Sequence, residues 1–291
     1  MSADAATSPA SAPHLSDADF DRFRDWFYRR TGVRFADSKR YFIDKRIAAC
    51  LAESEHDDFG AWFTAIRLGG DQALEMRAIA RMTVHETYFM REDYQLSCLV
   101  DEVLPEVVDD VGLDATVRIL SLPCSTGDEP YSIGISLLER WPEIETVDVE
   151  IVGMDIDAES VAAAREGTYG ARALQRLSPE LSRRYFAPVP GDRRQISADL
   201  RSAVSFRVGN VCDTQQMRAY RGYDVIFCRN LLIYFDELSC RRAAENLFGM
   251  LRPGGFLFLG HSESMSRISP IFDPVRFPTA TVYQRPFEEG S

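Results

Sequence analysis

Residues 117–132 have the sequence VRILSLPCSTGDEPYS, and this stretch decides the fold class. It opens with a short apolar run at 117–122, which is typical of a buried strand. A turn containing proline, serine, threonine and glycine follows, and helical periodicity then continues from Glu129 to Arg140. A strand that runs through a turn into a helix is a building unit of α/β proteins, so we predict a sheet with covering helices.

Strands and helices continue to alternate after this stretch. Four more strands are predicted from apolar runs at 147–154, 206–208, 223–228 and 256–259. Helical patterns fall at 158–166 and 237–251, and the LRPGG sequence at 251–255 is typical of a helix stop. A β-hairpin is predicted within 272–285. The alternation predicts an α/β domain over 115–288, with a doubly wound, mostly parallel sheet.

Three other regions depart from this alternation. Residues 171–203 are too long for an ordinary connection, so we predict an inserted subdomain at the edge of the sheet. Residues 15–85 show only helical periodicity, which predicts a small all-helical N-terminal domain. Its helices are expected from Ser16 and at 38–51, 59–68 and 72–82. We expect a disordered tail at 1–14 and a linker with a helix at 86–114.

The composition excludes several classes of protein. The 291 residues are 45% hydrophobic and 11% aromatic, which is enough for a core. The net charge of −12 argues against a general nucleic-acid-binding protein. No apolar run approaches 18 residues and no secretory leader is visible, so we expect no membrane insertion. Six cysteines without a CxxC pair predict free thiols in the cytoplasm and no metal site.

The turn at 123–127 also suggests a ligand. It has one glycine, so the GxGxxG fingerprint that cradles a pyrophosphate is missing. Asp128 and Glu129 stand where a phosphate would need backbone amides, and their negative charge favours a cation. S-adenosylmethionine, with its ammonium and sulfonium groups, is the cofactor of this general fold that meets the requirement. The alternative is that both acids only stabilise the helix N-terminus.

Polar residues follow the other predicted strands. We expect Asp155 to accept hydrogen bonds from ribose hydroxyls, and Asp157 to cap the next helix. Asn210 is expected either to contact the adenine edge or to form a plain turn. Arg229 and Asn230 interrupt an apolar run, and because their burial without partners is costly, a site position is favoured.

Two aromatic segments complete the set of candidates. Tyr234 lines the site or, as the alternative, packs in a core. Residues 82–91 have the sequence MTVHETYFMR, at the junction of the two domains. Its Tyr88 and Phe89, followed by Arg91, are placed to cap the site from the helical side.

Together these residues resemble the chemotaxis receptor glutamate methyltransferases of the CheR family. The resemblance runs from about residue 16 to 285 and rests on four motifs, CSTGDEPYSIG, GMDIDAESVAAAREGTY, FCRNLLIYF and LRPGGFLFLGHSES. It implies a helical N-terminal domain and a class I, Rossmann-like methyltransferase domain with an inserted β-subdomain. It also implies methyl transfer from S-adenosylmethionine to the γ-carboxylate of glutamates on chemoreceptor cytoplasmic helices. The second product would be S-adenosylhomocysteine.

The resemblance implies residue roles as well. Glu129 would take the methionyl ammonium and Asp155 the ribose, while Arg91 and Tyr234 are the catalytic candidates beside the transferred methyl. At position 85 this chain has His where the family usually has Asn. The implied cofactor contacts are His85, Thr87, Arg91, Glu129, Asp155, Asn210, Val211, Arg229 and Asn230. The loop around 189–194 is short compared with members that grip a receptor C-terminal pentapeptide, so we expect no such tether.

A basic segment at residues 29–46 stands out against the acidic whole. It has seven basic and two acidic residues, a net charge of +5. One interpretation is an ordinary solvated helix face. The other, which the family resemblance favours, is a dock for an acidic receptor bundle that recruits the protein to membrane receptor arrays. The docking candidates are Arg34, Lys39, Arg40, Lys45 and Arg46.

Overall fold

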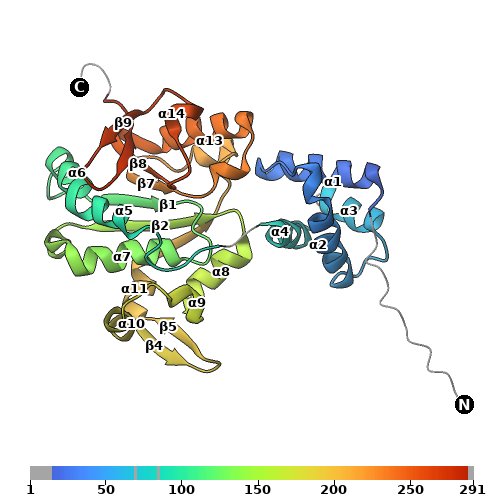
Figure 1. Cartoon of the computed structure of the whole chain (residues 1–291), viewed down its shortest axis with the longest axis horizontal. Coiled ribbons are helices and arrows are strands. Elements are labelled where there is room, and N and C mark those ends of the chain that lie inside the picture. The colour runs from blue at the N-terminus through green and yellow to red at the C-terminus, as the bar shows by residue number, and fades with distance from the viewer. Residues whose placement is uncertain (1–14, 69–70, 84–85, 288–291) are drawn as a thin grey trace, which may run out of the picture. The chain divides into compact units, whose positions relative to one another are not determined.

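The computed structural model describes residues 15–68, 71–83 and 86–287. These residues divide into two units (Figure 1). The first takes in the described residues up to Arg30 and from Arg34 to Thr83, and the second contains Thr31–Val33 and the described residues from 86 onward.

The first unit is all-helical, as the periodicity predicted. Its elements are α1 (Asp17–Thr31, whose last residue belongs to the second unit), η1 (Asp37–Lys39), α2 (Arg40–Ala52), α3 (Phe59–Arg67) and α4 (Gln72–Met82). The predicted cap of α1 is present, since the Ser16 hydroxyl accepts a hydrogen bond from the Asp19 amide at 3.1 Å. Phe23, Trp62 and Phe63 are fully buried at the centre, where Phe23 and Trp62 stack with ring centroids 6.1 Å apart.

The second unit is built on a seven-stranded sheet. Its order is β6 (Val204–Val208), β2 (Val149–Asp155), β1 (Val117–Ser121), β7 (Tyr223–Cys228), β8 (Leu251–Leu259), β10 (Thr281–Gln284) and β9 (Asp273–Arg276). The first five strands are parallel, and β10 and β9 form the predicted antiparallel hairpin. The chain order of the strands reverses at β1, which therefore lies between β2 and β7. The carboxyl ends of β1 and β7 form the topological switch point, where sheets of this kind bind ligands.

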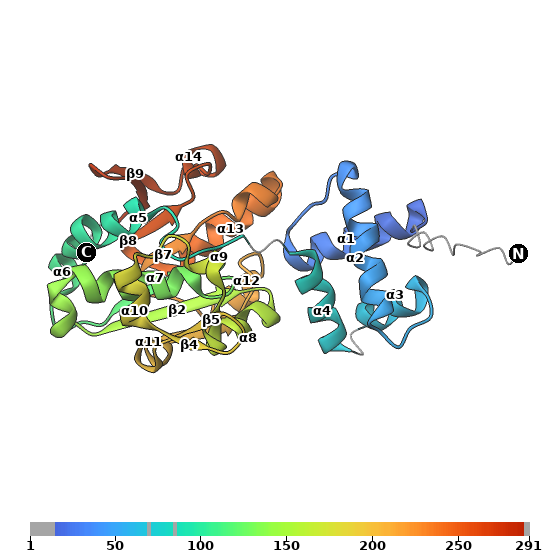
Figure 2. The ribbon, with the colours of Figure 1, turned by 60° about the horizontal axis from the view of Figure 1, so that its bottom comes forward.

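Both faces of this sheet are buried, which confirms the predicted doubly wound fold. Alternate strand residues enter two separate apolar clusters, for example Ile119 and Leu120 of β1. One cluster includes residues of α7 (Asp128–Arg140), α8 (Ala158–Glu166) and the stretch 93–111, and the other includes residues of α12 (Thr214–Met217), α13 (Glu237–Met250) and α14 (Met265–Ile268) (Figure 2). The short elements η3 (Pro142–Glu145) and η4 (Leu232–Tyr234) lie in connections.

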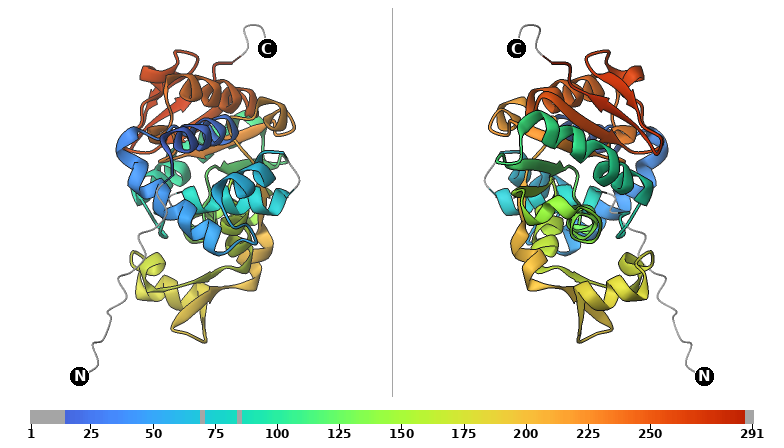
Figure 3. Two further views of the ribbon diagram at one scale, coloured as in Figure 1. Left: turned by 90° about the vertical axis from the view of Figure 1, so that its right-hand side faces the viewer. Right: turned by 90° about the vertical axis from the view of Figure 1, so that its left-hand side faces the viewer.

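The inserted subdomain begins earlier than residue 171. Its three-stranded sheet has the order β3 (Thr168–Tyr169), β5 (Arg193–Ile196) and β4 (Phe186–Val189). It also contains α9 (Ala171–Leu174), α10 (Pro179–Tyr185) and α11 (Ala198–Ala203). The two residues of β3 are too few to give a strand signal, so the sequence did not reveal them. Figure 3 shows this subdomain (yellow) and the terminal hairpin (red) at opposite ends of the unit.

The helix stop predicted at 251–255 is confirmed, because α13 ends at Met250, but the next strand begins before the predicted residue 256. Strand β8 already begins at Leu251, and the residues after it stay in the strand through a register shift between Tyr223 and Val225 of β7. Gly254 has a φ of +78°, which permits the irregularity. Proline and glycine therefore mark a β-bulge at the start of β8 as well as the end of the helix.

A helical stretch at 93–111 leads into the sheet. It consists of α5 (Asp93–Cys98), the π-helical turn η2 (Leu99–Val103) and α6 (Leu104–Val111). The Leu104 amide donates to the carbonyl of Leu99, five residues earlier. The wide turn has a local cause, because the ring of Pro105 would clash with the carbonyl of Asp101 in a regular α-helix.

The amino-terminal ends of the strands are joined by a buried carboxylate, Asp224. It accepts hydrogen bonds from the Arg118 amide at 2.7 Å and from Nε of Arg252 at 2.5 Å. We expect Asp224→Ala to lower the free energy of unfolding by about 3 kcal/mol, because two buried donors lose their acceptor. Urea denaturation measures this change.

The matched control is Glu150→Ala. Glu150 forms an ion pair with the same Arg118 at 2.7 Å, but about half of its side chain is exposed. A surface pair of this kind contributes less than about 1 kcal/mol. Equal losses in the two variants would contradict the assigned role of Asp224.

Candidate functional site

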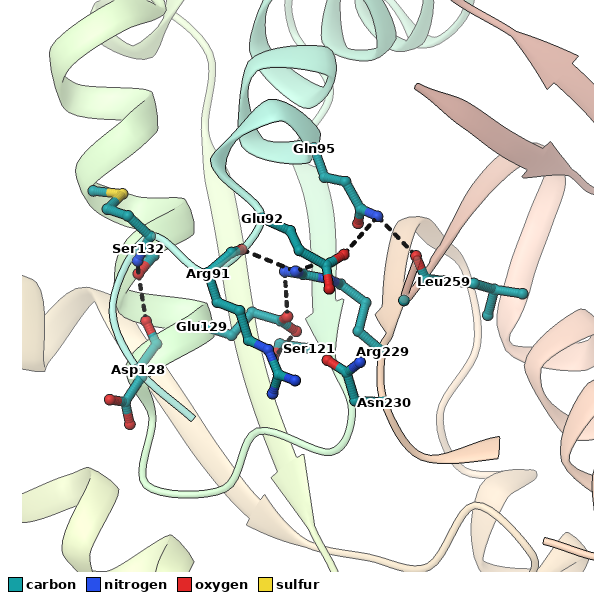
Figure 4. A network of polar contacts seen from close by, with 12 residues as sticks. Arg91, Glu92, Gln95, Ser121, Asp128, Glu129, Ser132, Arg229, Asn230 and Leu259 are labelled. Atoms are coloured by element: carbon teal, nitrogen blue, oxygen red, sulfur yellow. Dashed lines mark hydrogen bonds and ion pairs between the residues drawn. The ribbon is translucent and has the colours of Figure 1, made fainter. Parts of the chain in front are cut away.

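A network of charged side chains gathers at the carboxyl ends of β1 and β7, at the switch point (Figure 4). Glu129 comes from the first turn of α7, and Arg229 directly follows β7. Residues 90–92, which precede α5, supply the third side of the network. Three segments far apart in the sequence therefore meet at the place where the topology predicts a ligand.

Arg229 lies at the centre, with only 2% of its side chain exposed. Nη1 donates to Oε2 of Glu129 at 2.8 Å. Nη2 donates to the carbonyl of Arg91 at 2.8 Å and lies 3.2 Å from Oε2 of Glu92. The sequence argument favoured a site position because burial without partners is costly; the structure shows Arg229 buried, with two carboxylates and a carbonyl as its partners.

Glu129 is held in one orientation from two sides. The Ser121 hydroxyl donates to Oε1 at 2.9 Å, while Arg229 binds the other oxygen. Burial raises the pKa of the Glu129 carboxyl, and Arg229 opposes that rise. The side chain keeps 15% of its surface exposed, and carboxylate oxygens can each accept more than one hydrogen bond.

Asp128 does not take part in this network, although the sequence paired it with Glu129. Figure 4 shows its side chain directed away from Arg229. It is fully buried. One oxygen accepts from the Thr126 hydroxyl at 2.6 Å, and the other has no hydrogen-bond partner among the residues that the structure describes. Burial raises its pKa to about 6.

Glu92, Gln95 and His261 are network residues that the sequence did not single out. Glu92 accepts from Nε2 of Gln95 at 3.2 Å and lies 2.9 Å from Nδ1 of His261. Gln95 also donates to the carbonyl of Leu259 at 2.8 Å. Burial acts to raise the pKa of Glu92, but Arg229 and His261 outweigh it and the pKa is lowered. The sequence offered one signal for Glu92, which is its position directly after Arg91, a residue already predicted to lie at the site.

The two acids at the end of β2, Asp155 and Asp157, have different roles. Asp157 accepts from the Glu159 amide at 2.8 Å, so its predicted role as N-cap is confirmed. Asp155 is buried, and its two oxygens accept from the amides of Ser125 at 2.8 Å and of Asp157 at 2.9 Å. Asp155 thereby fixes the turn after β1. Carboxylate oxygens accept more than one hydrogen bond, so a ribose contact remains compatible.

The segment after β6 forms a turn. Oδ1 of Asn210 accepts from the amide of Cys212 at 2.9 Å, which is the plain-turn alternative for this residue. Val211 is 3% exposed and belongs to the apolar cluster that contains α13. The backbone here follows the edge strand of the parallel sheet.

Residues 230–234 are held by one carboxylate, that of Glu263. It accepts from the amides of Asn230 at 2.8 Å, Leu232 at 2.7 Å and Gly260 at 2.9 Å. Asn230 has a φ of +59°. Tyr234 is 42% exposed, so the core alternative for this residue is wrong.

The segment at 86–91 approaches the same network. His85 lies outside the described residues, and Thr87 is half-buried. The guanidinium of Arg91 donates to the carbonyl of Glu86, lies 5.8 Å from the ring centroid of Tyr88, and is close enough to Glu129 to lower its pKa. Phe89 anchors the segment by packing edge-on against Tyr169 and Phe186 of the inserted subdomain.

The basic segment at 29–46 is only partly available at the surface. Arg40 pairs with Asp17 at 2.5 Å, and Arg46 donates to the Arg81 carbonyl. Both arginines are half-buried in the first unit. Arg34, Lys39 and Lys45 are exposed, as is Tyr41, at 73%.

Three broader expectations concern cysteines, metals and membranes. All six cysteines are free thiols. Among the described residues, no cluster of three or more His, Cys, Asp or Glu side chains has the arrangement of a metal site. Over the same part of the chain, no helix has both the length and the apolar character that crossing a membrane requires.

Two family models match this chain. Residues 85–281 match the model described as "CheR methyltransferase, SAM binding domain", and residues 18–83 match "CheR methyltransferase, all-alpha domain". Chemotaxis protein methyltransferase 2 of Vibrio cholerae serotype O1 is 45% identical over 277 residues, which cover 95% of this chain and 96% of that protein. Chemotaxis protein methyltransferase of Vibrio parahaemolyticus is 31% identical and covers 93% and 98%.

One of the solved structures that the chain matches is an N-methyltransferase of Bradyrhizobium japonicum in complex with S-adenosyl-L-homocysteine. It has 13% sequence identity and a TM-score of 0.40, and the match covers 77% of this chain and 98% of that one.

The buried Asp128 predicts a pH-dependent stability. Its pKa is about 6 in the folded chain against an ordinary value of 3.8, so the folded state keeps a proton that the unfolded state has lost between these values. The energetic cost of its charge therefore grows as the pH rises above about 4 and is complete above about pH 6. We expect Asp128→Asn to be more stable than the wild type by about 1–3 kcal/mol near pH 8, and by about half of that near pH 5.

Urea denaturation at the two pH values measures the difference. The control is Asp109→Asn, because Asp109 is exposed on α6 and its neutralisation should change the free energy of unfolding by less than about 0.5 kcal/mol. A gain that does not depend on pH would rule out the carboxylate charge as its cause.

Proposed function

Because this chain belongs to the CheR family of S-adenosylmethionine-dependent chemotaxis methyltransferases, we propose that it methylates glutamate side chains on the cytoplasmic helices of chemoreceptors. The products are glutamate γ-methyl esters and S-adenosylhomocysteine. The observation that carries the proposal is the oriented, partly exposed Glu129 carboxylate at the switch point. It is an acceptor for an ammonium group at the place where α/β sheets bind nucleoside ligands.

The residues present fit S-adenosylmethionine. The buried network contains two carboxylates and one guanidinium, so it favours a cationic ligand. Glu129 would hold the ammonium, Asp155 the ribose, and Asn210 with Val211 the adenine. The methionyl end would lie near Thr87, Arg91, Arg229 and Asn230. When bound, the cofactor supplies an electrophilic methyl group on a sulfonium.

The chain's own residues have to align the acceptor and exclude water. A glutamate side chain has an ordinary pKa of about 4.3, so the acceptor is already ionised at neutral pH and no strong general base is required. Arg91 would hold one carboxylate oxygen while the other attacks, and its forked guanidinium suits this task better than a lysine. Tyr234, exposed on η4, would border the acceptor.

The substrate class can be tested directly. The full chain is incubated with methyl-labelled S-adenosylmethionine and membranes that contain chemoreceptors, and the product is then treated with base. We expect the label to be released as volatile methanol, because carboxyl methyl esters hydrolyse in base. Base-stable label would indicate a different acceptor and refute the proposal.

Arg91→Ala separates positioning from cofactor binding. We expect kcat to fall by about 100-fold or more, because the acceptor loses its orientation. The Kd of S-adenosylhomocysteine, measured by calorimetry, should change by less than about threefold. Equal losses in turnover and in affinity would contradict the proposed positioning role of Arg91.

We also propose that the protein is cytoplasmic and meets its receptor through the exposed part of the basic segment. Arg34, Lys39 and Lys45 present positive charge, and the exposed ring of Tyr41 lies between the lysines in sequence. A glutamate-rich receptor bundle has the complementary charge. Arg40 and Arg46, with partners inside the first unit, would support this surface rather than form it.

Lys39→Glu combined with Lys45→Glu should lower receptor methylation at least about tenfold and weaken its salt dependence. The affinity for S-adenosylhomocysteine should be unchanged. A matched control reverses Arg183 and Arg276, two exposed arginines of the second unit. An unchanged rate on receptor would refute the docking role.

Lys39 and Lys45 also allow the docking surface to be located directly, because they are the only lysines in the sequence. Carbodiimide coupling between receptor carboxylates and lysine amines can therefore form only at this surface or at the N-terminal amine. We expect cross-links at Lys39 or Lys45. Cross-links confined to the N-terminal amine would count against the proposed surface.

A further inference from the structure

The backbone at residues 90–92 adopts an uncommon conformation next to the charged network. Met90 has a φ of +58° and Glu92 a φ of +53°, both in the left-handed region. Non-glycine residues occupy this region rarely, and each costs of order 1 kcal/mol, so surrounding contacts must stabilise it. The Met90 amide donates to the Ser132 hydroxyl at 3.0 Å, and the Arg91 carbonyl accepts from Arg229.

The consequence of this conformation is the placement of the Glu92 carboxylate. Only 13% of the side chain is exposed, and it contacts Arg229 and Gln95 (Figure 4). It also lies 2.9 Å from Nδ1 of His261. Glu92 and Glu129 bind the same guanidinium through different nitrogens, Nη2 and Nη1. Arg229 is therefore shared between an acid from the 90–92 segment and an acid from α7.

The charge count shows what Glu92 adds. Arg229 and Glu129 alone form a neutral pair, and a carboxylate already neutralised by a guanidinium attracts a second cation weakly. With Glu92 included, the three buried side chains carry one negative charge in excess, and the half-buried guanidinium of Arg91 acts on Glu129 from outside this group. His261 does not remove this excess unless it is protonated, and its ring is 66% exposed.

We propose that Glu92 is a positioning residue that acts as the second counter-ion of Arg229 and so leaves the negative charge of Glu129 available for the ligand's ammonium. Glu92 need not touch the ligand itself. Gln95, which bonds both Glu92 and the Leu259 carbonyl, fixes the acid in place. The inference rests on the proposed function, because it takes Glu129 to be the ammonium acceptor.

The substitution Glu92→Gln removes the negative charge of this side chain and keeps its size, so it separates the effect of the charge from that of the shape. The amide oxygen of the variant can accept from Arg229 and Gln95, while its NH2 group can donate to unprotonated Nδ1 of His261. Calorimetry on the full chain compares two probes, S-adenosylhomocysteine and 5′-methylthioadenosine, which lacks the amino-acid carbons. We expect the Kd of S-adenosylhomocysteine to rise about tenfold and that of 5′-methylthioadenosine to stay within about twofold.

Two further variants complete the experiment. Glu92→Asp keeps the charge but shortens the side chain, so it should retain more S-adenosylhomocysteine affinity than Glu92→Gln. A role in packing alone predicts the opposite order. Glu150→Gln is the matched control, because it also takes a carboxylate from an arginine, at the amino-terminal half of β2, and should leave both Kd values unchanged.

Glu129→Gln distinguishes failure of this inference from failure of the proposed function. If Glu129→Gln weakens S-adenosylhomocysteine selectively but Glu92→Gln does not, Glu92 is not the counter-ion and the inference alone is overturned. If neither variant has a selective effect, the ammonium role of Glu129 fails as well. If Glu92→Gln weakens both probes equally, its effect is a general structural one, which also overturns the inference.

Discussion

One buried guanidinium, that of Arg229, organises the site. A cation with 2% of its side chain exposed cannot remain unpaired, so the chain must bring acids and carbonyls to it. It receives Glu129 from α7, Glu92 from the segment before α5 and the carbonyl of Arg91. Glu129 is proposed to bind the cofactor directly, and Glu92 to act on it through Arg229. The contacts that pair one buried charge therefore also help to assemble the proposed methyl-transfer site.

The sheet topology makes that assembly possible. Parallel strands place their carboxyl ends along one edge, and the reversal of chain order at β1 leaves a place for ligand between the loops of β1 and β7. Two carboxylates then fix the loops by accepting backbone amides, Asp155 for the turn after β1 and Glu263 for residues 230–232. The loops are therefore held by charge-assisted hydrogen bonds in addition to the apolar packing of Leu122, Cys124 and Leu232.

Much of the fold and part of the site could be predicted from the sequence. Apolar runs located the parallel strands, and Asp157 was correctly separated from Asp155 as the cap. The errors have physical causes. A β-bulge allowed Pro253 and Gly254 to remain inside β8, although such residues usually end an element. The two residues of β3 form a strand only because β5 is there to pair with them.

The sequence by itself determined the class of fold, the order of its elements and the family motifs, because periodicity and turn residues act locally along the chain. Only the tertiary structure decided which acid serves which purpose. Asp128 and Glu129 are adjacent in sequence, yet one is buried away from the network and the other binds Arg229. Glu92, which lies 37 positions before Glu129 in the sequence, binds the same Arg229. Ion pairing and burial depend on distances through space, which no local pattern records.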